Sequence, residues 1–260
     1  MHDTTTTLPL HGGHTIPTLG LGVWQMTQSE ETEQAIMYAL SVGYRHIDTA
    51  KLYGNEESVG KAIQQSTIPR EEIFVTTKLW PTDAFSAETA LQDSLKRLGL
   101  AYVDLYLIHW PIPLFGDRVW KQMETLAQQG LARNIGVSNY SRTQMEELLE
   151  QATIPPAVHQ IECNPFTYDR KLIEFCQQHN IVVEAYSPLT RGLHLDDATI
   201  VKLAMHYAKT PAQIMLRWAL QKGTVVIPKS SNKARITENA DIFSFSISAD
   251  DMRRLDALSH

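Results

Sequence analysis

The stretch YVDLYLIHWP, residues 102–111, is typical of a buried β-strand that carries a histidine to its carboxyl end. Apolar side chains dominate residues 103–108. Pro111 ends the hydrogen-bonded ladder, because proline has no N–H to donate. The stretch therefore places His109 and Trp110 at the edge of a hydrophobic sheet.

Seven similar runs lie along the chain, and amphipathic stretches separate them. The strand-like runs cover residues 18–23, 44–48, 73–79, 132–138, 157–162, 181–187 and 224–230. Helical patterns cover residues 29–43, 55–66, 87–99, 118–130, 141–151, 169–179, 199–209, 211–223 and 232–241. Strands that alternate with helices predict parallel strands joined by right-handed crossovers. Eight such strands favour an α/β fold of the closed (β/α)8 TIM-barrel type.

The remaining segments complete this prediction. Two short apolar runs, residues 7–10 and 14–17, flank two glycines and predict an N-terminal β-hairpin. No linker or break in composition divides the chain, so we expect a single TIM-barrel domain over residues 1–260. A six-stranded doubly wound sheet is the alternative. Against it, LGLGVWQ has Gln25 where the dinucleotide fingerprint requires a third glycine.

The composition is that of an ordinary soluble protein. A net charge of −6 with 20% charged residues gives no support for a nucleic-acid or anionic-membrane surface. No apolar run approaches the ~18 residues of a transmembrane helix, and the first residues do not resemble a signal peptide. Cys163 and Cys176 fit no zinc or redox spacing. We therefore expect two reduced thiols in a cytoplasmic protein.

Polar side chains gather at the carboxyl ends of the predicted strands, where barrel enzymes place their chemistry. They are Asp48, Lys78, His109, Ser138, Asn139, Gln160, Glu162, Glu184, Tyr186, Ser187, Lys229, Ser230 and Ser231, with Tyr53 in the loop after Asp48. A buried ammonium needs a partner, which Asp48 can supply to Lys78. The ammonium would lower the pKa of the Tyr53 phenol, and His109 would share its proton or orient a carbonyl. These four residues predict a tuned general acid, with a purely structural Asp–Lys ion pair as the alternative.

Tryptophans also fall at the predicted strand ends. They are Trp24, Trp80 and Trp110. A single tryptophan at such a place usually packs against the core. Three of them in the loops of one barrel face predict an apolar mouth for a substrate.

The stretch IPKSSNKARITEN, residues 227–239, predicts an anion site after the last strand. It carries Lys229, two serines and then Arg235 near the start of an expected helix. A helix N-terminus attracts anions, lysine adds a point charge, and arginine adds a planar fork suited to phosphate. Phosphate binding is the interpretation we favour, with a solvated basic loop as the alternative.

These segments together resemble the aldo-keto reductases, especially their bacterial diketogluconate reductase-like branch. The matching segments are LGLGVWQM (19–26), GYRHIDTAKLYGNEESVGKAI (43–63), TTKLW (76–80), YVDLYLIHWP (102–111), IGVSNY (135–140), QIECNPF (160–166), VVEAYSPL (182–189) and IPKSSNKARITEN (227–239). The resemblance implies a TIM barrel that binds NADPH without a Rossmann domain. It also implies reduction of aldehydes or ketones, such as α-keto-aldehydes or keto-sugars, to alcohols.

The resemblance further implies a role for each site residue. The catalytic four would be Asp48, Tyr53, Lys78 and His109, with Tyr53 protonating the carbonyl oxygen while hydride passes from nicotinamide to carbon. The substrate pocket would comprise Trp24, Tyr53, Trp80, His109 and Trp110. The cofactor would be held by Ser138, Asn139 and Gln160 at the carboxamide, Tyr186 at the nicotinamide ring, Ser187 and Leu189 at the pyrophosphate, Lys229, Ser230 and Arg235 at the 2′-phosphate, and Glu238 and Asn239 at adenine. Gly22, Trp24, Asp48 and Ser231 complete the expected cofactor set.

The chain also departs from the family's pattern. It stops soon after residues 249–259, where the family often carries a loop over the barrel mouth, and residues 111–120 form a short loop. From these features we expect an open pocket with broad substrate selection, and by resemblance we expect a monomer without a metal. Val23 stands where threonine is common, which would weaken one contact near the cofactor.

Three other functions remain as alternatives. A class I aldolase would use Lys78 to form a Schiff base with its substrate. A metal-dependent hydrolase could use His46, Asp48 and His109, but the usual zinc spacings are absent from the sequence. A non-catalytic, NADPH-binding redox sensor within a larger complex would retain the same catalytic four.

Overall fold

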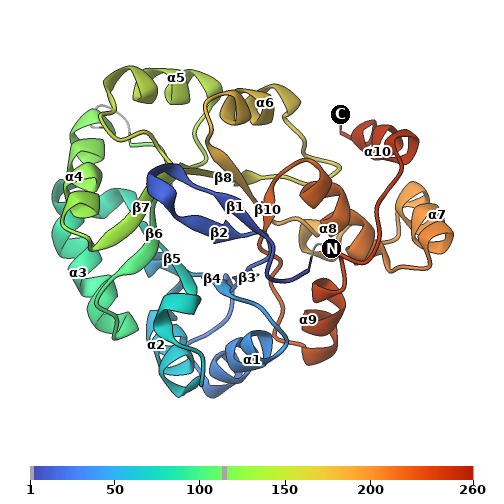
Figure 1. The fold of residues 1–260 in the computed structure, drawn as a ribbon, viewed down its shortest axis with the longest axis horizontal. Coiled ribbons are helices and arrows are strands. Elements are labelled where there is room, and N and C mark those ends of the chain that lie inside the picture. Colours follow the sequence, from blue (N-terminus) through green and yellow to red (C-terminus); the bar gives the residue numbers. More distant parts are fainter. Residues whose placement is uncertain (1–2, 113–115, 260) are drawn as a thin grey trace.

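The strands form a ring that places side chains both inside and outside it, because successive side chains of a strand point to opposite faces. The computed structural model describes residues 3–112 and 116–259. In these ranges eight parallel strands follow one another in chain order around the ring (Figure 1). They are β3 (Leu21–Gly22), β4 (His46–Asp48), β5 (Phe74–Leu79), β6 (Val103–Ile108), β7 (Ala132–Ser138), β8 (Val158–Glu162), β9 (Val182–Tyr186) and β10 (Val225–Val226).

The ring closes between its first and last strands. Leu19 bridges to Val226 and Gly22 bridges to Lys229, both in the parallel sense. The Gly20 N–H donates to the Val226 carbonyl at 2.9 Å. These contacts continue the sheet from β10 back to β3, so the predicted barrel is confirmed and the open doubly wound sheet is wrong.

Helices lie around the outside of the ring in Figure 1. In the described ranges they are α1 (Glu30–Ser41), α2 (Glu56–Gln65), α3 (Ala87–Leu98), α4 (Gly116–Gln128), α5 (Arg142–Gln151), α6 (Arg170–Gln178), α7 (Ala198–Tyr207), α8 (Pro211–Gln221), α9 (Lys233–Ala240) and α10 (Ala249–Asp256). The Ser29 side chain caps α1 by accepting from the Thr32 N–H. Gly99 ends α3 with φ 64, a left-handed conformation that glycine adopts without strain. The sequence patterns predicted every helix except α10.

The N-terminal hairpin seals one end of the barrel. Strands β1 (Thr7–Pro9) and β2 (Thr15–Pro17) pair antiparallel, and they lie across the middle of the ring in Figure 1. Leu10 and Ile16 are buried and pack in one cluster with interior strand residues such as Leu105. The predicted hairpin is therefore confirmed, and the polar strand ends lie at the opposite end of the barrel.

Candidate active site

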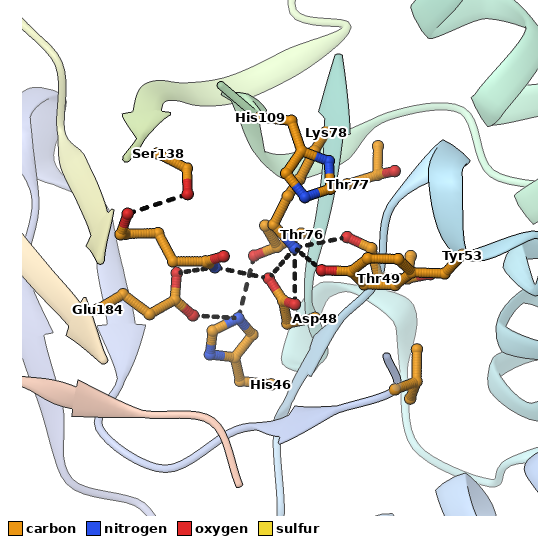
Figure 2. Close-up of polar contacts among 12 residues, drawn as sticks. His46, Asp48, Thr49, Tyr53, Thr76, Thr77, Lys78, His109, Ser138 and Glu184 are labelled. Carbon is orange, nitrogen blue, oxygen red and sulfur yellow. Dashed lines mark hydrogen bonds and ion pairs between the residues drawn. The ribbon is translucent and has the colours of Figure 1, made fainter. Parts of the chain in front are cut away.

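Three neighbouring strands bring the four predicted catalytic residues together (Figure 2). Asp48 ends β4, Lys78 is the penultimate residue of β5, and His109 follows β6. Tyr53 lies in a short 3-10 helix, Lys51–Tyr53, that begins three residues after Asp48. The parallel register places the carboxyl ends of these strands at one edge, as the barrel requires.

Lys78 is the centre of this group. Its Nζ donates to both Asp48 carboxylate oxygens at 2.7 Å, to the Thr49 carbonyl at 2.9 Å and to the Tyr53 hydroxyl at 3.3 Å. The side chain has no exposed area. Burial lowers the pKa of the ammonium, but the charge of Asp48 and the Tyr53 phenol outweigh that effect and hold the pKa above its ordinary value. Lys78 is therefore a permanent cation, which the Asp48 carboxylate balances.

The pKa of Tyr53 differs in direction from the sequence-based expectation. Burial raises this pKa above the ordinary value of a phenol, and Lys78 lowers it only in part. The expected net lowering is therefore wrong for this site, because desolvation of the phenolate outweighs the attraction of the ammonium. Tyr53 accordingly keeps its proton at neutral pH, and Lys78 is positioned to stabilise the phenolate once the proton has left.

His109 lies against the same phenol. Its ring meets the rings of Tyr53 and Trp80 edge to face, with centroids 5.7 and 5.2 Å apart. The Asn139 side chain donates to the His109 carbonyl at 3.0 Å, which fixes the backbone of the strand end. Burial, followed by the charge of Lys78, lowers the pKa of His109 to about 3. The imidazole is therefore neutral at physiological pH.

A cavity of about 860 Å³ opens beside these residues. Among the described residues, all the predicted site positions line it except Lys78 and Trp80. Lys78 is buried behind the cavity wall, and Trp80 is half-buried with its ring edge against His109. Part of the loop expected to border the substrate, residues 113–115, lies outside the described residues.

One half of the cavity is lined by an ordered set of amides and hydroxyls. The Ser138 hydroxyl donates to the backbone carbonyl of Gln160 at 2.9 Å. The Asn139 amide donates to the Ser138 hydroxyl at 3.0 Å and accepts from the Tyr186 hydroxyl at 2.9 Å. Asn139 adopts φ 64, a left-handed conformation that asparagine tolerates better than most residues. These hydrogen bonds hold the polar side chains of this wall in a defined arrangement.

The other half of the cavity reaches the N-terminus of α9 and is basic. Lys229 and Arg235 both line it. In the described parts of the chain, neither side chain takes part in an ion pair. The Asn232 side chain caps α9 by accepting from the Arg235 N–H at 3.1 Å. Two cations beside a helix N-terminus are well suited to an anionic group.

Arg191 belongs to the cavity although the sequence did not predict it. Its guanidinium lies 4.7 Å from the centre of the Trp24 ring, and both residues line the cavity. This contact joins the loop after β9 to the segment after β3. Three residues of the β9 loop, Ser187, Thr190 and Arg191, have φ between 47 and 55. Their left-handed backbone makes a tight turn that the pattern LTRGL alone did not reveal.

The described residues show neither a metal-binding cluster nor a membrane-spanning helix. No set of three or more His, Cys, Asp or Glu side chains there is arranged to bind a metal ion. None of the helices there combines the length and hydropathy needed to cross a membrane.

The sequence and the fold of this chain are similar to those of known reductases. The model of the aldo/keto reductase family matches residues 18–260. Methylglyoxal reductase DkgA of Yersinia pestis is 46% identical over 249 residues, which cover 94% of this chain and 90% of that protein. Glyoxal reductase of Bacillus subtilis is 44% identical over 255 residues, which cover 97% and 92%. A crystal structure of an aldo/keto reductase from Brucella melitensis is 46% identical, with a TM-score of 0.93 over 98% of this chain and all of that chain.

The fold and the comparisons define an oxidoreductase built on a TIM barrel. It carries out carbonyl reduction with a nicotinamide cofactor. The chain belongs to the aldo/keto reductase family.

Proposed function

We propose that this protein is an NADPH-dependent reductase of small aldehydes and α-keto-aldehydes, with Tyr53 as its general acid. The observation that carries the proposal is the 3.3 Å contact between the Lys78 ammonium and the Tyr53 hydroxyl at the wall of the cavity. A protonated phenol beside a fixed cation can give its proton to an oxygen and remain stabilised as phenolate. The names of relatives that reduce methylglyoxal and glyoxal support the substrate class.

The four residues divide the work of this step. NADPH, when bound, supplies the hydride that adds to the carbonyl carbon. Tyr53 gives its proton to the carbonyl oxygen, so that the product is a neutral alcohol. Lys78 and Asp48 hold the phenol in place and balance the charge that the departing proton leaves behind.

His109 is assigned a binding role rather than an acid role. With its pKa lowered to about 3, almost no imidazolium is present at neutral pH. The neutral ring can still donate one hydrogen bond to a carbonyl oxygen. Tyr53, which keeps its proton, is consequently the better acid of the two, and His109 orients the substrate.

The residues around the cavity suit a nicotinamide dinucleotide. The amides of Asn139 and Gln160 lie where a carboxamide could be recognised, and Tyr186 offers a ring held through its hydroxyl. Lys229 and Arg235 lie at the far end of the cavity without an ion-pair partner among the described residues. A ribose 2′-phosphate would supply that partner, and this supports a preference for NADPH over NADH.

We place the other assigned cofactor contacts along the same cavity. They are Gly22, Trp24, Asp48, Ser138, Ser187, Leu189, Ser230, Ser231, Glu238 and Asn239. The substrate would enter between Trp24 and Trp110, of which Trp110 is 46% exposed. Trp80 would act through His109, because it lies against that ring and not on the cavity surface.

We further propose that the enzyme acts as a monomer in the cytoplasm. Cys163 and Cys176 are both buried and free. Burial raises the pKa of each thiol to about 12, which keeps both in the unreactive protonated form. Such thiols suit a reducing compartment.

A steady-state assay tests the proposed function. NADPH and NADH would each be offered with methylglyoxal, glyoxal, an aromatic aldehyde and a keto-sugar, and oxidation of the cofactor followed by absorbance. We expect turnover with NADPH and the small aldehydes, and kcat/KM values for unrelated aldehydes within about a hundredfold of one another. Tight NADPH binding without turnover of any carbonyl would instead support a redox-sensing subunit.

The aldolase alternative has little support in the geometry. A Schiff-base lysine must attack as the neutral amine, whereas Lys78 is a fully buried cation with its pKa held above the ordinary value. Borohydride treatment in the presence of a carbonyl substrate would trap a covalent adduct on Lys78 if the aldolase chemistry operated. We expect no adduct there.

A further inference from the structure

A second carboxyl group lies buried beneath the catalytic four, and the proposed reaction does not use it. Glu184 comes from β9 and has no exposed area. Its Oε2 accepts from the Gln160 side-chain amide at 3.0 Å. The same Gln160 nitrogen donates to Asp48 Oδ2 at 2.9 Å. An amide nitrogen carries two hydrogens, and Gln160 donates one to Asp48 and the other to Glu184, so it links the two carboxyl groups.

The other oxygen of Glu184 has no such partner. Oε1 lies 3.5 Å from His46 Nε2, too far for a normal hydrogen bond. Among the described residues it is a buried oxygen without a hydrogen-bond partner. The His46 nitrogen that faces it contacts the Thr76 hydroxyl at 3.0 Å, as Figure 2 shows.

An ionised Glu184 would leave this buried group of side chains with one unbalanced negative charge. Lys78 contributes one positive charge and Asp48 one negative charge, and these two cancel. Burial, followed by the Lys78 charge, lowers the pKa of His46 to about 3, so His46 is neutral. An ionised Glu184 would then be an unpaired buried anion, which is strongly unfavourable. Burial, followed by the charge of Asp48, accordingly raises the pKa of Glu184 to about 8.

We propose that Glu184 is a positioning residue for the reduction, which carries a proton in the active enzyme and so keeps a second negative charge away from the Asp48–Lys78–Tyr53 group. This inference rests on the proposed function. The proton lies on Oε1, the oxygen without a donor, while Oε2 keeps the Gln160 amide nitrogen turned inward. The Gln160 oxygen is thereby left to face the cavity.

Ionisation of Glu184 acts on the reaction through Tyr53. The titratable groups that face Glu184 across the barrel are His46 and Asp48 on β4, Lys78 on β5 and Tyr53 in the loop after β4. On the described parts of the two strands beside β9, the neighbours are the Gln160 amide of β8 and the valines of β10, none of which titrates. A negative charge on Glu184 raises the pKa of Tyr53 further. Formation of the phenolate becomes less favourable, and proton transfer to the substrate slows.

The pH profile of Glu184→Gln tests this inference, because glutamine keeps the shape and cannot ionise. In the wild-type enzyme we expect kcat for aldehyde reduction to fall about three- to tenfold between pH 7 and pH 9, with its midpoint near pH 8. In Glu184→Gln this step should be absent. Glu162→Gln, which removes an exposed carboxylate at the end of β8, is the matched control and should keep the wild-type step.

A spectroscopic measurement on the wild-type protein covers the case in which Glu184→Gln fails to fold. The infrared spectrum of the ligand-free protein at pH 7 should contain the C=O stretching band of a protonated carboxylic acid. This band should disappear as the pH rises through about 8, and it should be missing from Glu184→Gln. Absence of the band from the wild type, or a kinetic step that persists in Glu184→Gln, would overturn the inference. The band is independent of turnover, so an enzyme that reduced no carbonyl would refute the proposed function alone.

Discussion

Replacement of Lys78 by methionine separates the electrostatic role of this residue from its volume. The Lys78 ammonium donates to both oxygens of Asp48, to the Thr49 carbonyl and to the Tyr53 hydroxyl. Methionine has a similar length and no charge, so little space is created. Asp48 would keep the Gln160 amide as its donor but lose its cation. Removing one partner of a buried ion pair costs about 3–5 kcal/mol, and we expect a loss of this size in the free energy of unfolding at pH 8.

The size of this destabilisation should depend on the pH and on whether residue 48 can carry a charge. A buried Asp48 without a cation binds a proton more tightly in the folded state than in the unfolded state, and the resulting stability is present at low pH and lost as the pH rises. The destabilisation should therefore be smaller at pH 5 than at pH 8. The double variant Asp48→Asn/Lys78→Met leaves no buried charge at this place, and it should recover about half of the loss or more. Reduction should be severely impaired in both variants, because neither retains the ammonium beside Tyr53.

Urea unfolding followed by tryptophan fluorescence measures these free energies, since the chain has five tryptophans. Curves for the wild type, the single variant and the double variant would be recorded at pH 5 and pH 8. A single variant as stable as the wild type at pH 8 would refute the reasoning. So would a double variant that is no more stable than the single one, because the unpaired carboxylate would then not be the cause.

Three further substitutions test other parts of the site and fold. Tyr53→Phe should lower kcat by at least about a hundredfold with an unchanged Kd for NADPH by fluorescence titration; a near-normal kcat would contradict the acid role. Arg235→Ala should weaken NADPH binding by about 1.5–3 kcal/mol and leave NADH binding nearly unaltered. If calorimetric titration showed equal losses of affinity for both cofactors, Arg235 would not bind the 2′-phosphate. His159 is buried with its pKa lowered to about 3 from 6.5, so the unfolded state takes up its proton first and stability falls on acidification. The unfolding free energy of His159→Gln minus that of the wild type should therefore rise by about 2 kcal/mol as the pH is lowered from 7 to 5. If urea unfolding of both proteins at the two pH values showed no such rise, His159 would be protonated in the folded protein.

The barrel could be predicted from the sequence because its signals are local and repeated. Each strand is a short apolar run between turn signals, and most helices begin at a capping residue such as Ser29 or Ser141. Helix α10 was missed for a physical reason. It has eight residues, and Leu255 is its one fully buried apolar side chain. Such a short amphipathic pattern is too weak to distinguish from a loop.

The candidate site was predictable to the extent that strand ends determine it. Asp48, Lys78 and His109 follow from the rule that polar residues at the carboxyl ends of barrel strands converge. The sign of the Tyr53 pKa shift did not follow, because it depends on how burial competes with the nearby ammonium. Arg191 escaped prediction as well, since its contact with Trp24 joins two loops far apart in the chain.

Glycines allow close contacts inside the barrel, and one of them borders its polar layer. A Cβ on Gly20 would lie 2.7 Å from His46 Nδ1, and one on Gly136 would lie 2.3 Å from the Val158 carbonyl oxygen. Both distances are too short for a side chain. Glycine at position 20 therefore leaves room for the buried His46 ring, and glycine at position 136 lets β7 approach the backbone of β8. Charge placed in such a space must be balanced there, by the cation of Lys78 and by the proton that we assign to Glu184. The acidity of Tyr53 is therefore a property of this whole layer, and changes at its hidden members should alter the pH dependence of the enzyme even where they leave the cavity surface intact.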